Sequence, residues 1–153
     1  DGLDVREALR AFRAHYHQHC LDRTTPYPGV VATLGELAPL PMAIVSNKPE
    51  PMCVTIAEGL GLSEFLGAVV GARPSVPVKP DPSLLLAALS ELGIAGGAED
   101  VWMVGDSGTD VLAAREIGAT AVAVDWGLTE PSALLALRPD LMLSEFAELA
   151  SRV

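Results

Sequence analysis

Residues 101–110 read VWMVGDSGTD and combine an apolar stretch with a charged turn. Four apolar residues, typical of a buried strand, lead into Gly105 and Asp106, and a second carboxylate follows at Asp110. Two carboxylates at one place repel each other unless a cation, a proton or a positive side chain compensates them. The stretch therefore predicts a strand that ends in a site where charge is compensated.

Short apolar stretches alternate with helical patterns through most of the chain. Such alternation is typical of a parallel sheet with helices on both faces, so we expect an α/β fold with a Rossmann-like, doubly wound parallel sheet. The expected strands are 41–47, 65–72, 101–104, 120–125 and 141–144, and the expected helices are 30–38, 50–60, 82–92, 109–117, 131–137 and one at the C-terminus.

The N-terminal segment lies outside this alternation. Residues 4–21 carry apolar side chains at helical spacing, and TTPYPG (24–29) then interrupts regular structure with two prolines and a glycine. We expect residues 1–23 to belong to a second subdomain, residues 24–29 to form a hinge and residues 30–153 to form the core.

Composition and charge limit the class of function. The chain has 153 residues, about one domain, and a net charge of -10, which argues against a nucleic-acid partner because phosphate binding needs a basic face. No apolar run reaches the ~18 residues of a membrane helix. Cys20 and Cys53 show no CxxC spacing and indicate reduced thiols of a cytoplasmic protein. The oligomeric state is not determined by these features.

Polar side chains follow three of the predicted strands. Ser46 and Asn47 end the first, Lys79 lies in the proline-rich loop after the second, and Asp106 ends the third. Right-handed crossovers bring the carboxyl ends of parallel strands to one edge of a sheet, where ligands bind. We therefore expect these residues and Asp110 to meet there.

This set of groups meets the needs of phosphoryl transfer. Carboxylates suit Mg²⁺, which takes one or two of them and keeps water and phosphate oxygens as its other ligands. Ser46 and adjacent N–H groups can hold phosphate oxygens, whose charge a lysine can offset. The chain contains two lysines, Lys48 and Lys79, both beside the expected site. The pattern predicts a Mg²⁺-dependent phosphate site.

Each residue also has a structural interpretation. Ser46 and Asn47 could cap the following helix, Asp110 could interact with a helix dipole, and Lys79 could be a solvated loop residue. Their occurrence together, in order and at strand ends, favours a functional site.

The histidines of the first predicted helix give a second, less favoured hypothesis. His15 and His19 are four residues apart and share a helix face, a spacing that suits zinc. The sequence offers no third ligand in a matching context, so we expect this segment to be helix surface.

The sequence resembles the haloacid dehalogenase-like superfamily, and within it the phosphoglycolate phosphatase-like branch. AIVSNKP (43–49) resembles the second family motif, VKPDP (78–82) the third, and VGDSGTDVLAAREIGA (104–119) the fourth. PYPGV (26–30) resembles the hinge between a helical cap and the core, and VDWG (124–127) resembles a loop common in this branch.

The resemblance implies a role for each polar residue. Ser46 would bind phosphate, and Lys79 would bridge phosphate and nucleophile. Asp106 would be a direct Mg²⁺ ligand, and Asp110 an outer-shell carboxylate that orients a metal-bound water or Lys79. The expected set is catalytic Ser46, Asn47 and Lys79, substrate-binding Ser46, Asn47 and Lys48, and metal-binding Asp106 and Asp110.

One family motif is missing from the sequence. The Asp-x-Asp at the end of the family's central strand, which supplies the nucleophile and the acid/base, does not occur, and Asp1, Asp4 and Asp22 lack the strand context to replace it. The resemblance thus implies a core that lacks its first, central strand, with residues 1–23 as the C-terminal part of a helical cap. We expect no turnover by this chain alone. We expect the missing strand to come from a segment outside it, with another chain or a rearranged fold as alternatives.

By resemblance, the complete protein would be a Mg²⁺-dependent phosphatase of small phosphomonoesters that acts through a phosphoaspartate, with 2-phosphoglycolate as the favoured substrate. A phosphosugar mutase or a pyrophosphatase is the enzymatic alternative, because specificity lies mainly in the cap. A dehalogenase is disfavoured, because that branch uses no metal and lacks an Asp at the position of Asp106. A phosphate-binding module without turnover, or a purely structural fragment, is the non-enzymatic alternative.

Overall fold

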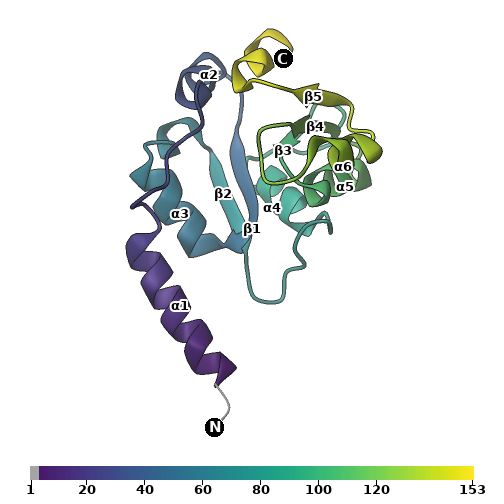
Figure 1. Cartoon of the computed structure of the whole chain (residues 1–153). Helices are drawn as coiled ribbons and strands as arrows, with labels where there is room; N and C mark the ends of the chain where they lie inside the picture. The colour runs from purple at the N-terminus through teal and green to yellow at the C-terminus, as the bar shows by residue number, and fades with distance from the viewer. Residues whose placement is uncertain (1–3) are drawn as a thin grey trace.

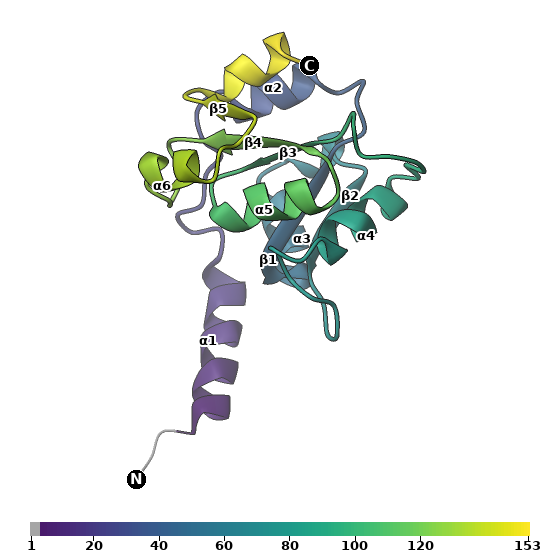
Figure 2. The same cartoon turned by 90° about the vertical axis from the view of Figure 1, so that its right-hand side faces the viewer.

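The computed structural model describes residues 4–153. A helix, α1 (Val5–His19), extends away from an α/β body formed by the rest of the chain (Figures 1 and 2). The strands of this body are β1 (Ala43–Pro49), β2 (Ala68–Ala72), β3 (Trp102–Gly105), β4 (Thr120–Val124) and β5 (Leu141–Leu143). Its helices are α2 (Val30–Glu36), α3 (Glu50–Gly59), α4 (Ser83–Glu91), α5 (Gly108–Glu116) and α6 (Pro131–Ala136), with short 3₁₀ helices η1 (Ser63–Phe65) and η2 (Phe146–Ser151).

The predicted alternation of strands and helices is confirmed, and the bounds of several elements differ by a few residues. The second strand begins at Ala68 rather than at residue 65, because η1 precedes it and its pairing with β1 starts only there. The first strand continues through Pro49, two residues beyond the predicted end, with a register shift between Val45 and Pro49. The C-terminal helix is the 3₁₀ helix η2.

The strands form two separate parallel sheets within residues 4–153. β1 pairs with β2, and β3, β4 and β5 form the second sheet in that order. The break lies between β1 and β3 (Figure 1), and both of these strands are only partly buried along their length, whereas β2 and β4 are largely buried. Inner strands of a doubly wound sheet are normally the most buried. The break therefore fits a parallel sheet that lacks its central strand, as predicted.

Alternate residues of β4 build the two sides of the second sheet. Ala121 and Ala123 face a cluster that includes Val111 of α5 and Leu134 of α6. Val122 and Val124 face the other side, where Leu143 and Leu149 pack. Successive residues of a strand point to opposite faces, so an uninterrupted apolar strand serves a sheet that is covered on both sides. None of the helices within residues 4–153 has the length and hydropathy needed to cross a bilayer.

The N-cap of α1 is Asp4, whose side chain accepts a hydrogen bond from the Arg6 N–H at 2.9 Å. The helix buries none of its residues. Its predicted apolar stripe is divided: Tyr16 is partly buried, while Val5 and Phe12 are 75% and 61% exposed. Helix α1 is thus set apart from the α/β body, and its assignment to a second subdomain stays a prediction.

Candidate active site

The polar residues predicted from the sequence lie on elements that border the break between the sheets. Ser46 and Asn47 are in the last part of β1, and Lys79 is in the loop between β2 and α4. Asp106 follows β3 directly, and Asp110 is in the first turn of α5. The hydrogen bonds described below connect these elements to one another.

The side chain of Lys79 connects the two sheets. Its Nζ donates a hydrogen bond to the carbonyl oxygen of Val45 in β1 at 2.5 Å and contacts Oδ1 of Asp110 in α5 at 2.6 Å. The Lys79 side chain is 7% exposed and that of Asp110 is 8% exposed. A buried charge is costly unless it is paired and hydrogen-bonded, and Lys79 is both. The interpretation of Lys79 as a solvated loop residue is therefore wrong.

Asn47 fixes the backbone of Lys79. Its Nδ2 donates to the Lys79 carbonyl oxygen at 2.8 Å, and its Oδ1 accepts from the Lys79 N–H at 2.9 Å. This pair of bonds attaches the loop to β1 and sets the direction of the lysine side chain. The capping interpretation of Asn47 is wrong, because the N-cap of α3 is Pro49 and no side chain caps it.

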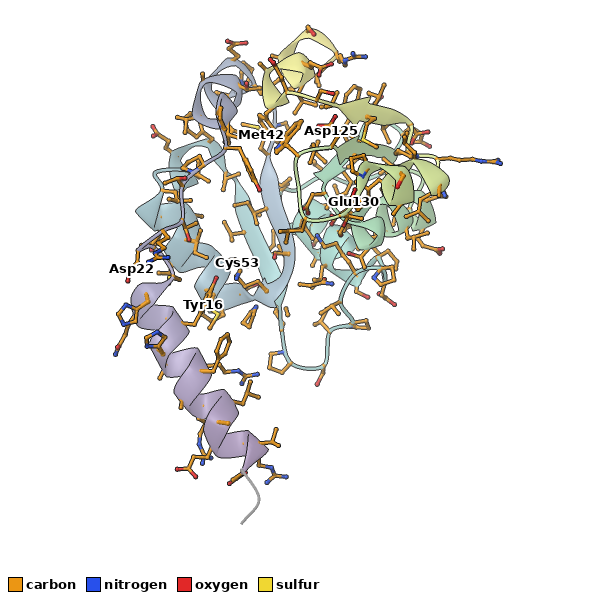
Figure 3. All side chains as sticks on the ribbon, in the orientation of Figure 1. Tyr16, Asp22, Met42, Cys53, Asp125 and Glu130 are labelled. Carbon is orange, nitrogen blue, oxygen red and sulfur yellow. The ribbon has the colours of Figure 1, made fainter. Side chains whose placement is uncertain are left out.

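Ser46 and Lys48 form the part of the site nearest α1. Ser46 Oγ accepts the Lys48 N–H at 3.1 Å, and its own hydrogen can be donated to a ligand or to the neighbouring Cys53 thiol. Lys48 Nζ donates to the hydroxyl of Tyr16 at 2.6 Å and lies 4.4 Å from the centre of that ring. Figure 3 shows Tyr16 in the last part of α1, on the side towards the body. Tyr16 therefore links α1 to Lys48.

Both oxygens of Asp110 are engaged. Oδ1 contacts Lys79, and Oδ2 accepts the N–H of Ser107 at 3.0 Å and its hydroxyl at 2.7 Å. The bond from the Ser107 N–H is part of a capping box at the start of α5. Asp110 therefore also has the helix-terminus role that the sequence left open. Gly105 makes room for this carboxylate, because a Cβ there would lie 2.5 Å from Asp110 Cβ and closer still to the carboxyl group.

Asp106 has a different environment. Its Oδ2 accepts the backbone N–H of Leu128 at 2.9 Å. Within residues 4–153, Oδ1 makes no hydrogen bond or ion pair, and the residue is partly exposed. Of the two carboxylates, Asp106 is therefore the one with an oxygen available to a ligand.

The donor chemistry fits a Mg²⁺ ion held by Asp106. Mg²⁺ needs one or two protein carboxylates and takes its other ligands from water and phosphate. The described part of the chain contains no group of three His, Cys, Asp or Glu side chains that could hold a metal by itself. Asp110 could act on such an ion only indirectly, because its oxygens are taken up by Lys79 and Ser107.

The histidines of α1 make contacts among themselves and with the linker. The rings of His15 and His19 are 4.3 Å apart, and His19 Nδ1 lies 2.8 Å from Oδ2 of Asp22. The zinc hypothesis gains no third ligand from residues 4–153.

Some contributors to the site were not predicted from the sequence. Ser107 could have been recognised, because Ser followed three residues later by an acid is a capping-box pattern. The contact of Tyr16 with Lys48 and that of Leu128 with Asp106 join residues far apart in the chain, and no local pattern indicates them.

Comparison with known proteins identifies the family. A family model of haloacid dehalogenase-like hydrolases matches residues 2–118. The chain is 39% identical over 151 residues to a phosphoglycolate phosphatase of Chromobacterium violaceum, with 97% of this chain and 66% of that protein covered. It is 32% identical over 147 residues to a phosphoglycolate phosphatase of Pectobacterium atrosepticum, with 95% and 62% covered.

A solved structure agrees. A haloacid dehalogenase-like family hydrolase from Streptococcus pneumoniae matches with a TM-score of 0.86 and 25% identity over 99% of this chain and 71% of that one. The chain belongs to the haloacid dehalogenase-like hydrolases, and its predicted likeness to the phosphoglycolate phosphatase-like branch is confirmed. The chain spans 66% and 62% of the length of the two curated relatives.

Proposed function

We propose that the complete protein containing this chain is a Mg²⁺-dependent phosphatase of small phosphomonoesters, with 2-phosphoglycolate as the favoured substrate. The observation that carries the proposal is the buried Lys79–Asp110 pair between β1 and α5, with Ser46 and Asp106 on the neighbouring strand ends. The names of the curated relatives support the choice of substrate.

The chain's own groups provide for phosphate binding and charge neutralisation. Ser46 donates its hydroxyl hydrogen to a phosphate oxygen, and Lys79 offsets the negative charge of the transferring group. Asn47 acts through Lys79, whose backbone it holds at two atoms. Lys48 binds the substrate from the side of α1. Asp106 holds Mg²⁺, which when bound neutralises phosphate charge, and Asp110 orients the ammonium group of Lys79.

The nucleophile lies outside these 153 residues in this proposal. A strand carrying the family's Asp-x-Asp occupies the break between β1 and β3, where the edges of both sheets are partly exposed. The first carboxylate attacks phosphorus as the ester oxygen leaves with a proton from the second, and water then hydrolyses the phosphoaspartate. This chain alone therefore has no turnover.

The remaining assignments follow the same division of the chain. Residues 1–23 are the end of a helical cap, 24–29 the hinge, and 30–153 the core. Gly29 supports the hinge, because its φ of +80° lies in the left-handed region that glycine adopts without strain. Cys20 and Cys53 are free buried thiols, which supports a cytoplasmic protein.

A substrate panel tests the proposal. The complete protein is incubated with 2-phosphoglycolate, a hexose 1-phosphate and pyrophosphate, with Mg²⁺ or with a chelator, and both free phosphate and organic products are measured. We expect Mg²⁺-dependent phosphate release, fastest from 2-phosphoglycolate. Isomerisation of the hexose phosphate without phosphate release would instead identify a mutase. Phosphate binding without release from any compound would identify a binding module.

A further inference from the structure

The loop that follows β4 contacts the carboxylate of Asp106. We refer to residues 125–128 as the DWGL loop. The N–H of Leu128, the last residue of the loop, donates to Oδ2 of Asp106 at 2.9 Å. This is the one hydrogen bond that the Asp106 side chain makes within residues 4–153. The DWGL loop thus engages one carboxylate oxygen and leaves the other available.

Gly127 lies so close to Asp106 that no side chain fits at this position. An added Cβ would lie 2.5 Å from Oδ2 and 2.7 Å from Cγ of Asp106, and closer still to Cβ, whereas real Cβ contacts essentially never fall below 3.0 Å. Rotation of the carboxyl group would not relieve the overlap, because the backbone fixes the position of Asp106 Cβ. A side chain at residue 127 would therefore displace Asp106 or the loop.

The other residues of the loop hold it in place. The Asp125 N–H donates to the carbonyl oxygen of Leu143 at 3.1 Å, and Asp125 Oδ2 accepts the hydroxyl of Ser144 at 2.7 Å. Trp126 packs against the cluster of Val124 and its neighbours. Figure 3 labels Asp125 at this side of the second sheet. The loop is therefore attached to β5 at one end and to Asp106 at the other.

We propose that the DWGL loop positions Asp106 for metal binding, with Gly127 as the positioning residue that admits the carboxylate and the Leu128 N–H as the group that orients it. The inference rests on the proposed assignment of Asp106 as the Mg²⁺ ligand. Loss of a group that orients a metal ligand typically costs about ten- to a hundredfold in metal affinity.

Calorimetric titration of the complete protein with Mg²⁺ alone measures metal binding and tests the inference without the enzymatic reaction. We expect Gly127→Ala to raise the Kd for Mg²⁺ about tenfold or more. Leu135→Ala controls for the loss of an exposed apolar side chain, because Leu135 is 57% exposed and belongs to α6 rather than to the loop. Gly35→Ala controls for the substitution type, because its added Cβ would meet only Phe65 at 3.9 Å. Neither control should change the Kd.

Ser144→Ala provides a second test of the loop in case the Gly127→Ala variant does not fold. This variant removes only the hydroxyl that anchors Asp125, and we expect a smaller rise in the Kd. In a protein that binds Mg²⁺, unchanged affinity in a folded Gly127→Ala variant, or in Ser144→Ala where Gly127→Ala does not fold, would overturn the role of the loop and leave the metal assignment standing. A wild-type protein that binds no Mg²⁺, or an Asp106→Asn variant that binds it equally well, would overturn the metal assignment and the loop's role together.

Discussion

Lys79 Nζ lies 2.6 Å from Oδ1 of Asp110, and both side chains are more than nine-tenths buried. The same nitrogen donates to the Val45 carbonyl oxygen, so one ammonium group joins β1 to α5 beside the break between the sheets. A pair of this kind is weak evidence for stability, because desolvation offsets most of the attraction. Its position among phosphate-binding and metal-binding candidates indicates a role in function instead.

Removing one member of this pair should cost both stability and activity. Lys79→Met leaves Asp110 buried without its cation, which typically destabilises a protein by about 3–5 kcal/mol. Urea unfolding should show this loss in the complete protein. Arg152→Met is the control: the pair of Arg152 with Glu148 lies at the surface, where solvent screens the attraction, and its loss should change stability little.

A double variant separates the two effects. Lys79→Met combined with Asp110→Leu replaces the buried pair with apolar groups, a change that is often neutral for stability. We expect stability to recover in part, because the bonds of Asp110 to Ser107 are lost as well, while kcat stays lower than that of the wild type by about 10² or more. Recovery of kcat together with stability would show that the Lys79–Asp110 pair has a purely structural role.

Asp106→Asn should abolish Mg²⁺-dependent turnover with little change in stability. The amide keeps an oxygen that can accept the Leu128 N–H, while the negative charge that attracts the ion is lost. Initial rates measured over a range of Mg²⁺ concentrations would show the effect. Wild-type rates in the Asp106→Asn variant at every Mg²⁺ concentration would show that Asp106 is not a metal ligand.

Variants of Asn47 test whether catalysis requires the backbone of Lys79 to be held in place. Asn47→Ala loses both hydrogen bonds to Lys79 and should cost about 1–3 kcal/mol, because partly buried backbone groups are left unpaired. Asn47→Asp keeps the acceptor for the Lys79 N–H and loses the donor to the Lys79 carbonyl oxygen. We expect its stability to lie between those of the wild type and Asn47→Ala. Chemical denaturation and kcat would be compared, and an unaffected kcat in Asn47→Ala would contradict the positioning role.

Tyr16 should act on substrate binding through Lys48. Tyr16→Phe loses the 2.6 Å hydrogen bond and keeps the ring beside the ammonium, so we expect a KM raised about threefold with kcat unchanged. Tyr16→Leu removes the ring as well and should raise KM further. Val5→Ala, on the same helix and 75% exposed, should leave KM unchanged. Equal KM values across the series would mean that Tyr16 does not position Lys48.

The thiol of Cys53 should make stability depend on alkaline pH. Burial raises the pKa of this thiol above its usual value of 9.0, so the folded state keeps the neutral form while the unfolded chain ionises. The thiol's contribution is therefore complete below pH 9 and is lost as the pH rises through the folded-state pKa. Unfolding measured between neutral and alkaline pH should show a smaller alkaline loss in Cys53→Ala. The same slope in both proteins would contradict this.

The sequence was sufficient to predict the alternation of strands and helices, because buried parallel strands are continuously apolar and helices are bounded by glycine and proline. It also placed Ser46, Asn47 and Asp106 at strand ends, Asp110 at a helix start and Lys79 in the loop after the second strand. It did not predict that Lys79 is buried, because that depends on Val45 and Asp110, each more than thirty residues away. The close approach of Gly127 to Asp106 is likewise a tertiary contact, which no local periodicity encodes.

The most direct measurement compares the 153-residue chain with the complete protein in one assay, phosphate release from 2-phosphoglycolate with Mg²⁺ present. We expect the complete protein to release phosphate and the 153-residue chain to release none, because the nucleophile belongs to a strand outside it. Turnover by the 153-residue chain that is lost in its Asp106→Asn variant would contradict this, and so would a complete protein that releases no phosphate.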